Sequence, residues 1–359
     1  MAHPRDVLLG AQAAAGFLPV CDHYSGVEAR MRKSLQLQAE MTDEFGACVF
    51  DVTLDCEDGA PVGGERDHAR MVVALAREAQ GHARKAGRPA APRIAVRVHP
   101  VDHPAFEEDV ATIVGGAAAS LCHLMIPKVE CVADVERAVA AVDAAASGTA
   151  RTTPLPLQVL LESPAAVHRA FDIAAHARVQ SISFGLMDFV SAHGGAIPDS
   201  AMSSRPDSLT GQPGQFSHPL VLRAKLEIAA ACHAHGKVPS HCVVTEFSDT
   251  EAMKLAARKA ARELGYTRMW SIHPSQIRPI LEALAPDAAD IERAAAIIEA
   301  AQAAQWAPVS YDKQLHDRAS YRYFWQVLER AHQTGRALPP AMQPYFAALA
   351  APKPQGVPA

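Results

Sequence analysis

With 359 residues, of which 49% are hydrophobic, the chain can bury the core of one large α/β domain together with a smaller appendage. Its 34 Lys and Arg are outnumbered by 39 Asp and Glu, and the net charge of -5 offers no broad basic surface to nucleic acid. The sequence shows no apolar signal core at its start and no apolar run long enough to span a bilayer, and its seven cysteines form no Cys-x-x-Cys pair. We therefore expect a cytoplasmic protein with reduced thiols that binds neither nucleic acid nor membrane.

Apolar segments of strand length recur along the chain, and most are continuous, as the buried strands of a parallel sheet require. Helical patterns separate most of them, although the third crossover looks short. Ser163 and Asp249 are predicted helix N-caps, and Pro164 suits a first helical position. Repeated strand–helix units favour closure into a (β/α)8 TIM barrel over an open sheet. The predicted strands are residues 16–21, 47–54, 93–98, 121–126, 155–161, 179–185, 238–244 and 268–272.

Two regions depart from this alternation. Residues 189–218 are rich in Gly, Ser and Pro and are too long for an ordinary connection, so they are either a lid over the barrel mouth or a disordered insertion. After residue 300 the barrel pattern stops and aromatic residues crowd a short stretch. The predicted organisation is a catalytic barrel at residues 1–300, a C-terminal helical arm at 301–350 and a disordered tail at 351–359.

Polar residues follow many of the predicted strands, and polar groups at one end of the strands build the active site of a parallel barrel. Glu162 and Asp188 close the fifth and sixth strands, so their carboxylates are expected on neighbouring positions of the mouth. Each carboxylate either caps the following helix or binds a cation. As a neighbouring pair they suit a hard divalent cation such as Mg²⁺, which takes oxygen ligands and acts as a Lewis acid on an oxo or hydroxy acid.

Arg97 ends an otherwise apolar strand, where an unpaired charge is costly. It can pair with Glu57 or Asp58 at the end of the neighbouring strand, or bridge them and a developing enolate oxygen. Lys128 either extends this network or forms a structural ion pair. His273, at the end of the last strand, contacts substrate or is a hydrogen-bonded structural histidine.

With these residues in view, the chain resembles the HpcH/HpaI aldolase and citrate lyase beta-subunit superfamily, in particular its malyl-CoA and citramalyl-CoA lyases. The matching motifs occur in the family's order and cover most of residues 16–280. They are Leu54-Asp55-Cys56-Glu57-Asp58, Arg97-Val98, Pro127-Lys128-Val129-Glu130, Leu161-Glu162-Ser163, Phe184-Gly185-Leu186-Met187-Asp188 and Ser271-Ile272-His273-Pro274-Ser275-Gln276-Ile277.

The resemblance implies that Glu162 and Asp188 bind Mg²⁺, that Arg97 contacts substrate, and that Glu57 and Asp58 support the site. It also implies reversible cleavage of a 3-hydroxyacyl-CoA into acetyl-CoA and a 2-oxo acid. In similar lyases an Asp from the C-terminal arm of a neighbouring subunit is the acid and base, and Asp317 is the matching position here. This implies a homo-oligomer, a trimer or a hexamer.

Other activities use the same residues. A thioester hydrolase or a CoA-free aldolase of a pyruvate-derived acid can employ the same metal site and Arg97. A third hypothesis is that the protein is an accessory subunit of a citrate lyase-like complex. The residues Glu57, Arg97, Glu162 and Asp188 argue against a non-catalytic scaffold.

Overall fold

The computed structural model describes residues 3–10, 18–88 and 90–347, and these form two compact units. The larger unit comprises residues 19–43 and 48–284, and the smaller one contains the described parts of 1–18, 44–47 and 285–359. The boundary after the barrel therefore falls at residue 285, whereas the sequence suggested 300. The predicted disordered tail at 351–359 lies outside the described residues.

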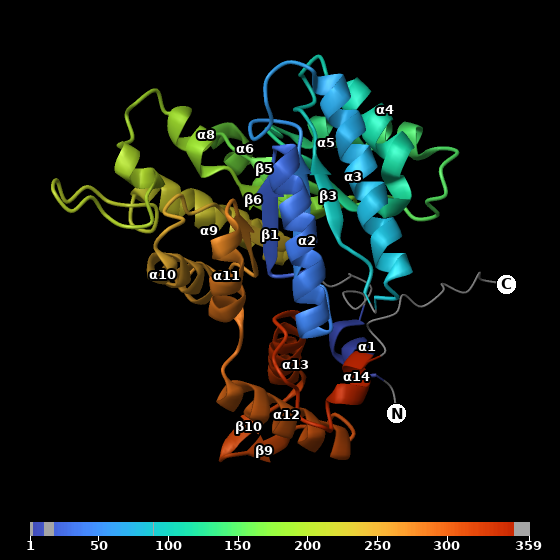
Figure 1. The fold of residues 1–359 in the computed structure, drawn as a ribbon. Coiled ribbons are helices and arrows are strands. Elements are labelled where there is room, and N and C mark those ends of the chain that lie inside the picture. The colour runs from blue at the N-terminus through green and yellow to red at the C-terminus, as the bar shows by residue number, and fades with distance from the viewer. Residues whose placement is uncertain (1–2, 11–17, 89, 348–359) are drawn as a thin grey trace. The chain divides into compact units, whose positions relative to one another are not determined.

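The larger unit is a closed barrel of eight parallel strands, which confirms the predicted fold (Figure 1). Strand order follows chain order, and pairing of the last strand with the first closes the ring. The strands are β1 (Cys21–Ser25), β2 (Phe50–Asp55), β3 (Ile94–Arg97), β4 (Leu121–Ile126), β5 (Leu157–Leu161), β6 (Val179–Phe184), β7 (Val238–His241) and β8 (Arg268–Ser271).

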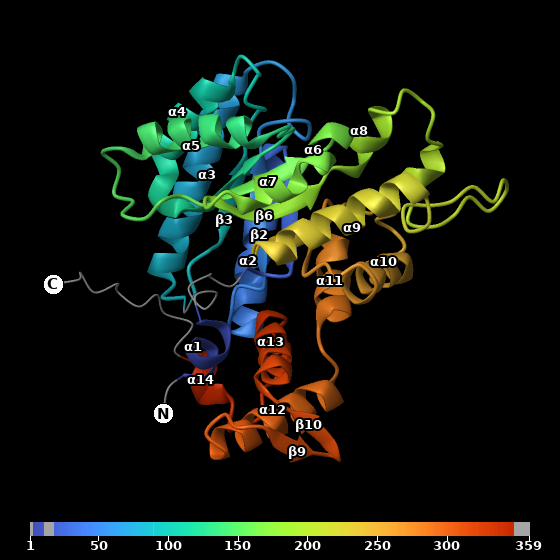
Figure 2. The same ribbon diagram turned by 180° about the vertical axis from the view of Figure 1, so that it is seen from behind.

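Helices follow the strands and cover the outside of the barrel (Figures 1 and 2). The predicted caps are confirmed, since Ser163 Oγ accepts the Ala166 N–H and Asp249 Oδ1 accepts the Ala252 N–H. The helices of this region are α2 (Glu28–Phe45), α3 (Glu65–Lys85), α4 (Phe106–Ala117), η2 (Ala118–Ser120), α5 (Val132–Ala146), α6 (Pro164–His168), α7 (Ala170–Ala175), α8 (Leu186–Ser191), η3 (Asp199–Met202), α9 (Pro219–Ala234), α10 (Thr250–Arg262), η4 (Pro274–Gln276) and α11 (Ile277–Leu284).

The first strand lies later than predicted, at Cys21–Ser25 instead of 16–21. The hydrophobic pattern did not predict this strand correctly, because the strand contains the polar residues Asp22 and His23 and nevertheless buries them. Asp22 pairs with Arg268 inside the barrel, and His23 hydrogen-bonds Ser34 of α2. Both side chains are almost fully buried.

The insertion at residues 189–218 is an ordered segment held to the loop after β7. Glu246 Oε1 accepts hydrogen bonds from Ser203 Oγ at 2.6 Å and from the Ser204 N–H at 3.0 Å. Gln215, near the end of the segment, accepts a hydrogen bond from Lys225 of α9. Figures 1 and 2 show the segment extending outward beside α8 and α9. Its hydrogen bonds show an ordered segment, and a role as a lid stays a prediction.

The smaller unit has its own apolar core and combines the start of the chain with the described residues after 284. Tyr321 and Trp325 are completely buried in that core, and among the aromatic side chains that the structure describes in this unit only Tyr323 is largely exposed, at 62%. The β-hairpin turns through Asp312 and Lys313, both at positive φ, a conformation that side chains other than Gly rarely adopt. The elements are α1 (Pro4–Leu9), α12 (Ala288–Ala303), β9 (Val309–Tyr311), β10 (Gln314–His316), α13 (Arg318–Gln333) and α14 (Gln343–Ala347).

Within the described part of the chain, none of the helices is long and apolar enough to cross a membrane.

Candidate active site

Predicted site residues gather at the carboxyl ends of the strands, because parallel strands all end on the same side of a barrel. Glu57 follows β2, Arg97 ends β3 and Lys128 follows β4. Glu162 comes directly after β5, and Asp188 lies in the first turn of α8, just beyond β6.

Arg97 is fixed chiefly by Asp55, a residue that the sequence analysis did not single out as its partner. Asp55 lies opposite Arg97 in the register of β2 and β3, and it accepts Arg97 Nε at 2.7 Å and Nη2 at 2.5 Å. Arg97 Nη1 also lies 2.9 Å from Glu57 Oε2. Burial alone would lower the pKa of Arg97, but Asp55 and then Glu57 raise it above its ordinary value. The guanidinium is therefore a fixed, fully charged group.

Backbone contacts in turn hold Asp55. Its two carboxylate oxygens accept the N–H groups of Glu57 and Gly59, each at 3.0 Å. A Cβ on Gly59 would collide with the Asp55 carboxylate, so only glycine allows this close approach. Because both oxygens are used by Arg97 and by backbone donors, Asp55 orients the arginine and is not itself available as a ligand.

Lys128 pairs with Glu57 and Asp58. Its Nζ lies 2.6 Å from Glu57 Oε1 and 3.2 Å from Asp58 Oδ2. Lys128 has a φ of 52°, a left-handed conformation that is unusual for a residue with a side chain. Glu130 does not join this network, since its carboxylate accepts a hydrogen bond from Ser163 Oγ at 2.7 Å.

Glu162 is a buried carboxylate without a cation partner. It is 5% exposed, and its Oε2 has no hydrogen-bond partner among the described residues. Burial, followed by the negative charge of Asp188, raises the pKa of Glu162 to about 8. A Cβ at Gly185 would lie 2.5 Å from Glu162 Cγ and 2.7 Å from Oε1, so this glycine leaves the space that the carboxylate occupies.

The mouth carries more negative than positive groups, and neither Glu162 nor Asp188 forms an ion pair with any residue that the structure describes. Two neighbouring carboxylates, one with an orphaned buried oxygen, fit a hard divalent cation that completes its coordination with water or substrate oxygens. The carboxylates are Asp55, Glu57, Asp58, Glu162 and Asp188, and the cations are Arg97 and Lys128.

Two predicted site residues are not part of this cluster. His273 is exposed and caps η4, where its Nδ1 lies 2.8 Å from Ser275 Oγ and its ring packs against Phe247. Asp317 belongs to the smaller unit, where its carboxylate caps α13 by accepting the Ala319 N–H at 2.9 Å. Substrate contact by His273 and proton transfer by Asp317 stay predictions.

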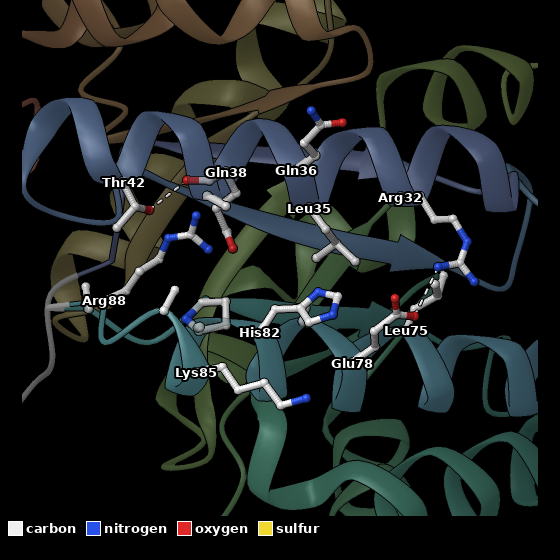
Figure 3. A pocket seen from close by; sticks show the side chains of 16 residues that line it. Arg32, Leu35, Gln36, Gln38, Thr42, Leu75, Glu78, His82, Lys85 and Arg88 are labelled. Carbon is white, nitrogen blue, oxygen red and sulfur yellow. Dashed lines mark hydrogen bonds and ion pairs between the residues drawn. The ribbon is translucent and has the colours of Figure 1, made fainter.

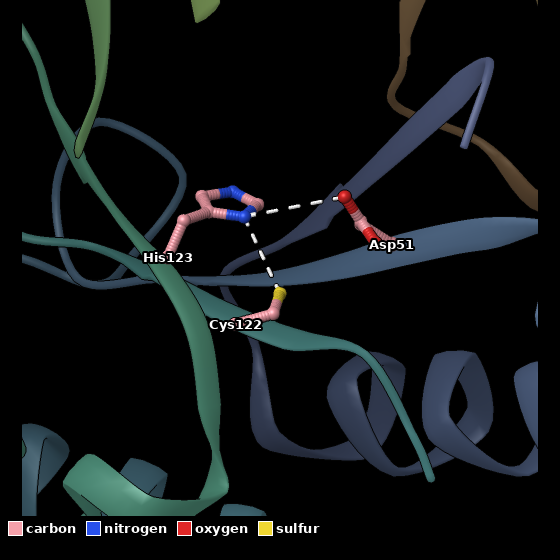
Figure 4. A group of neighbouring side chains, drawn as sticks. All are labelled: Asp51, Cys122 and His123. Carbon is pink, nitrogen blue, oxygen red and sulfur yellow. Dashed lines mark hydrogen bonds and ion pairs between the residues drawn. The ribbon is translucent and has the colours of Figure 1, made fainter. Parts of the chain in front are cut away.

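A second polar cluster lies at the opposite end of the barrel, where the strands begin. Asp51, Cys122 and His123 place possible ligand atoms within 4.8 Å of one another (Figure 4). Asp51 is already paired with Arg93 at 2.5 Å and with Arg268 at 2.7 Å. Burial raises the pKa of the Cys122 thiol, which disfavours the thiolate that metals bind. We interpret this cluster as a structural ion-pair network.

A cavity of about 610 Å³ lies between α2 and α3, outside the barrel (Figure 3). Its charged side chains are mostly satisfied, since Arg32 pairs with Glu78 and Arg88 pairs with Asp43. None of the predicted site residues lines it. The cavity therefore belongs to the helical layer and not to the candidate active site.

Comparisons with known proteins identify the family of the chain. A model of the HpcH/HpaI aldolase/citrate lyase family matches residues 35–274. An L-malyl-CoA/beta-methylmalyl-CoA lyase of Cereibacter sphaeroides is 32% identical over 216 residues, which cover 59% of this chain and 67% of that protein. The crystal structure of a citrate lyase from Burkholderia xenovorans is 48% identical, with a TM-score of 0.77, and covers 96% of this chain and 100% of that one. The structure of CitE from Mycobacterium tuberculosis with magnesium, acetoacetate and coenzyme A shares the fold at 20% identity, with a TM-score of 0.60 over 89% of this chain and 98% of that one.

Proposed function

Because the chain belongs to the HpcH/HpaI aldolase/citrate lyase family, we propose that it is a Mg²⁺-dependent carbon–carbon lyase acting on a 3-hydroxyacyl-CoA. The products are acetyl-CoA and a 2-oxo acid. One observation carries the proposal. An unpaired carboxylate pair, Glu162 and Asp188, shares the barrel mouth with a guanidinium that Asp55 fixes.

Cleavage requires three things of the site. The hydroxyl must lose its proton, the bond between the hydroxyl-bearing carbon and its neighbour must break, and the resulting thioester enolate must be stabilised until it is protonated. Mg²⁺ held by Glu162 and Asp188 supplies Lewis-acid polarisation of the substrate's oxygens.

Arg97 is the residue that stabilises the enolate. Asp55 and Glu57 use only some of its N–H donors, so the remaining donors are available to an oxygen in the mouth. Since the hydrogen bonds of Asp55 hold the guanidinium in place before substrate binds, little reorganisation is needed when charge develops. The ion pairs of Lys128 with Glu57 and Asp58 hold the Glu57 carboxylate, which contacts the Arg97 guanidinium, in position.

Asp317 is proposed as the group that moves the proton. It lies at the exposed start of α13, where a carboxylate accessible to solvent can exchange protons. We propose that it acts in a homo-oligomer, a trimer or a hexamer, in which the arm of one chain serves the barrel of another.

One assay tests the activity. Purified protein is incubated with Mg²⁺ and citramalyl-CoA or malyl-CoA, while free thiol, 2-oxo acid and acetyl-CoA are followed separately. Oxo acid formed together with acetyl-CoA supports the lyase. Free thiol without oxo acid would identify a thioester hydrolase. If no product forms, the accessory-subunit hypothesis is favoured.

A mixing experiment tests Asp317. Inactive Asp317→Asn and inactive Glu162→Gln chains are combined into mixed oligomers, and partial recovery is expected because some sites receive a sound arm and a sound metal site. No recovery in demonstrably mixed oligomers would exclude action between chains. Full activity of Asp317→Asn alone would remove this residue from the mechanism.

A further inference from the structure

A histidine–aspartate pair lies at the rim of the barrel mouth, two residues beyond Arg97. His99 Nδ1 lies 2.6 Å from Asp109 Oδ2, and the same oxygen accepts the backbone N–H of His99 at 3.2 Å. Asp109 lies in the first turn of α4 and is 1% exposed, whereas His99 is half-buried. Because its partner is a carboxylate, His99 Nδ1 carries a proton, and the ring is held in one orientation.

A second imidazole covers one face of this ring. His103 stacks on His99 with the ring centroids 4.2 Å apart and the ring planes 15° apart. His103 Nδ1 accepts the Ala105 N–H at 3.2 Å, so this nitrogen carries no proton and His103 is neutral. His99 Nε2 forms no hydrogen bond to any residue that the structure describes. Nε2 is therefore the atom of the pair that can act on a bound molecule.

The strand directs His99 toward the proposed position of the substrate. Pairing with β4 continues beyond the end of β3, since the Val98 N–H donates to the Met125 carbonyl at 3.2 Å. Alternate residues of an extended strand face the same side, about 7 Å apart, so His99 follows Arg97 toward the solvent. A thioester held on Arg97 must extend its coenzyme A arm out of the mouth, because side chains fill the interior of the barrel. The enolate end of the substrate is then placed next to both residues.

The charges that face His99 favour its protonated form. Its hydrogen bond to Asp109 raises the pKa of His99 above the ordinary value of 6.5, burial lowers it in part, and the negative charges of Asp109, Glu57 and Glu65 add to the rise. Glu57 follows β2 and Glu65 begins α3. The stacked His103 is neutral and adds no opposing charge. The imidazolium is thus favoured as a proton donor at the mouth.

Cleavage of a 3-hydroxyacyl-CoA involves two proton transfers at different atoms. The hydroxyl loses its proton, which the proposed function assigns to Asp317, as its oxygen becomes the carbonyl of the oxo acid. The electron pair of the broken carbon–carbon bond becomes the thioester enolate, which needs a proton on carbon. Arg97 stabilises the enolate, but a guanidinium does not give up its proton. A second acid is therefore required at the mouth.

We propose that His99 protonates the enolate carbon and that Asp109 positions it, a role that rests on the proposed function. The Nε2–H bond breaks, its proton completes the methyl group of acetyl-CoA, and the ring becomes neutral. Solvent returns a proton to His99 while Asp317 gives the hydroxyl proton to solvent, so the protons balance. In the condensation direction neutral His99 takes a proton from the methyl group.

Exchange of the acetyl-CoA methyl protons isolates the step assigned to His99. Acetyl-CoA is incubated in D₂O with saturating Mg²⁺, and deuterium incorporation is followed by mass spectrometry alongside cleavage of citramalyl-CoA or malyl-CoA. His99→Gln should slow exchange and kcat by about 100-fold or more, with little change in KM, since general acid–base catalysis contributes roughly 10²- to 10⁴-fold. Asp102→Asn is the matched control, because it removes an exposed carboxylate of the same loop that pairs with Arg137, and both rates should equal those of the wild type.

The pH profile tests the pair by a readout other than loss of activity. Cleavage requires protonated His99, so kcat should be constant below the pKa of His99 and fall as pH rises through it. Asp109→Asn removes the hydrogen bond that raises this pKa most, so the fall should move to lower pH. In condensation the rate should rise with pH, and that rise should also move to lower pH. An NMR titration of the His99 ring nitrogens in the wild type and in Asp109→Asn measures the shift without turnover.

Two results would overturn the proposal. One is near-normal exchange and cleavage in His99→Gln, which would leave the lyase in place without a role for His99. The other is a lower kcat in Asp109→Asn with an unmoved pH profile, as expected of a merely structural contact. Exchange that depends on His99 in a protein that cleaves neither thioester would count against the lyase and in favour of His99. Absence of both exchange and cleavage in the wild type would contradict both.

Discussion

The two ends of the barrel contain similar residues but differ in charge balance. Where the strands begin, Asp22 and Asp51 meet Arg93 and Arg268 in a closed network, with Arg268 2.9 Å from Asp22 and 2.7 Å from Asp51. Burial lowers the pKa of His123 in the same network to about 3, so this imidazole is neutral. The buried charges at this end compensate one another.

The acidic groups at the mouth are not all paired. Asp55 and Glu57 are matched by Arg97 and Lys128, whereas neither Glu162 nor Asp188 has a cation partner among the described residues. Burial and the neighbouring Asp188 raise the pKa of Glu162 to about 8, so without a metal its carboxyl group keeps its proton at pH 7. We infer from the contrast that the balanced end supports the fold, whereas the unbalanced end is reserved for a cation and substrate.

Loss of either unpaired carboxylate should have the largest effect. Glu162→Gln or Asp188→Asn removes one of the two proposed protein charges on the cation, and turnover should fall by about three orders of magnitude or more. Mg²⁺ titration by calorimetry checks the cause. Undiminished Mg²⁺ affinity in both variants would disprove the assignment.

Asp51→Asn should lower the free energy of unfolding and leave Mg²⁺ binding at the mouth unchanged. It leaves Arg93 and Arg268 without a full countercharge, and removal of one partner from a buried pair costs about 3–5 kcal/mol. Urea denaturation measures this loss, and Mg²⁺ affinity at the mouth should stay unchanged. A large loss of Mg²⁺ affinity with little change in stability would mean that the cluster in Figure 4 is a metal site after all.

Arg97→Lys preserves the charge but loses the planar fork that Asp55 holds. If Arg97 stabilises the enolate, kcat should fall by roughly two to three orders of magnitude with little change in KM. Steady-state kinetics with the best substrate distinguish stabilisation of the transition state from binding of the ground-state substrate. A near-normal kcat with a raised KM would make Arg97 a residue that binds the ground state.

Gly185→Ala tests the space around Glu162 without changing any charge. The added Cβ would displace the carboxylate, and Mg²⁺ affinity should fall by about 10- to 100-fold, as for other residues that support a metal ligand. Gly195→Ala is a control in the insertion, since no atom lies within 4 Å of its Cβ position, although its positive φ adds local strain. Equal Mg²⁺ affinity in the two variants would contradict the proposed role of Gly185.

The pH dependence of Mg²⁺ binding should be the smallest effect. Because the pKa of Glu162 is about 8 without metal, binding at pH 7 must release its proton, and affinity should rise about fivefold from pH 7 to pH 8. For the metal-free protein the raised pKa favours the folded state fully below the ordinary value of 4.5, and this contribution is lost as pH rises through 8. Calorimetry in two buffers of different ionisation enthalpy measures the released proton. Glu162→Gln should show no such release.

Periodicity and strand-end residues predicted much of this molecule. Eight apolar segments separated by helical patterns were enough for the barrel, because buried parallel strands need continuous apolar sequence and helical crossovers. The prediction placed the first strand too early, since Asp22 and His23 are polar yet buried. It left residues 189–218 undecided between a lid and a disordered insertion, because their order depends on hydrogen bonds from Ser203 and Ser204 to Glu246, more than 40 residues later in the chain.

The sequence by itself determined the barrel and the likeness to a lyase family, together with the end of the barrel that carries Glu162 and Asp188. These features follow from local pattern, since a residue after a parallel strand must lie at the mouth. Only the tertiary structure decided that Asp55 holds Arg97 and that Tyr24 and Trp270 lie beneath it. The physical reason is that strand register and ring packing join residues far apart in the chain, and no local spacing encodes which of several nearby carboxylates meets a given arginine.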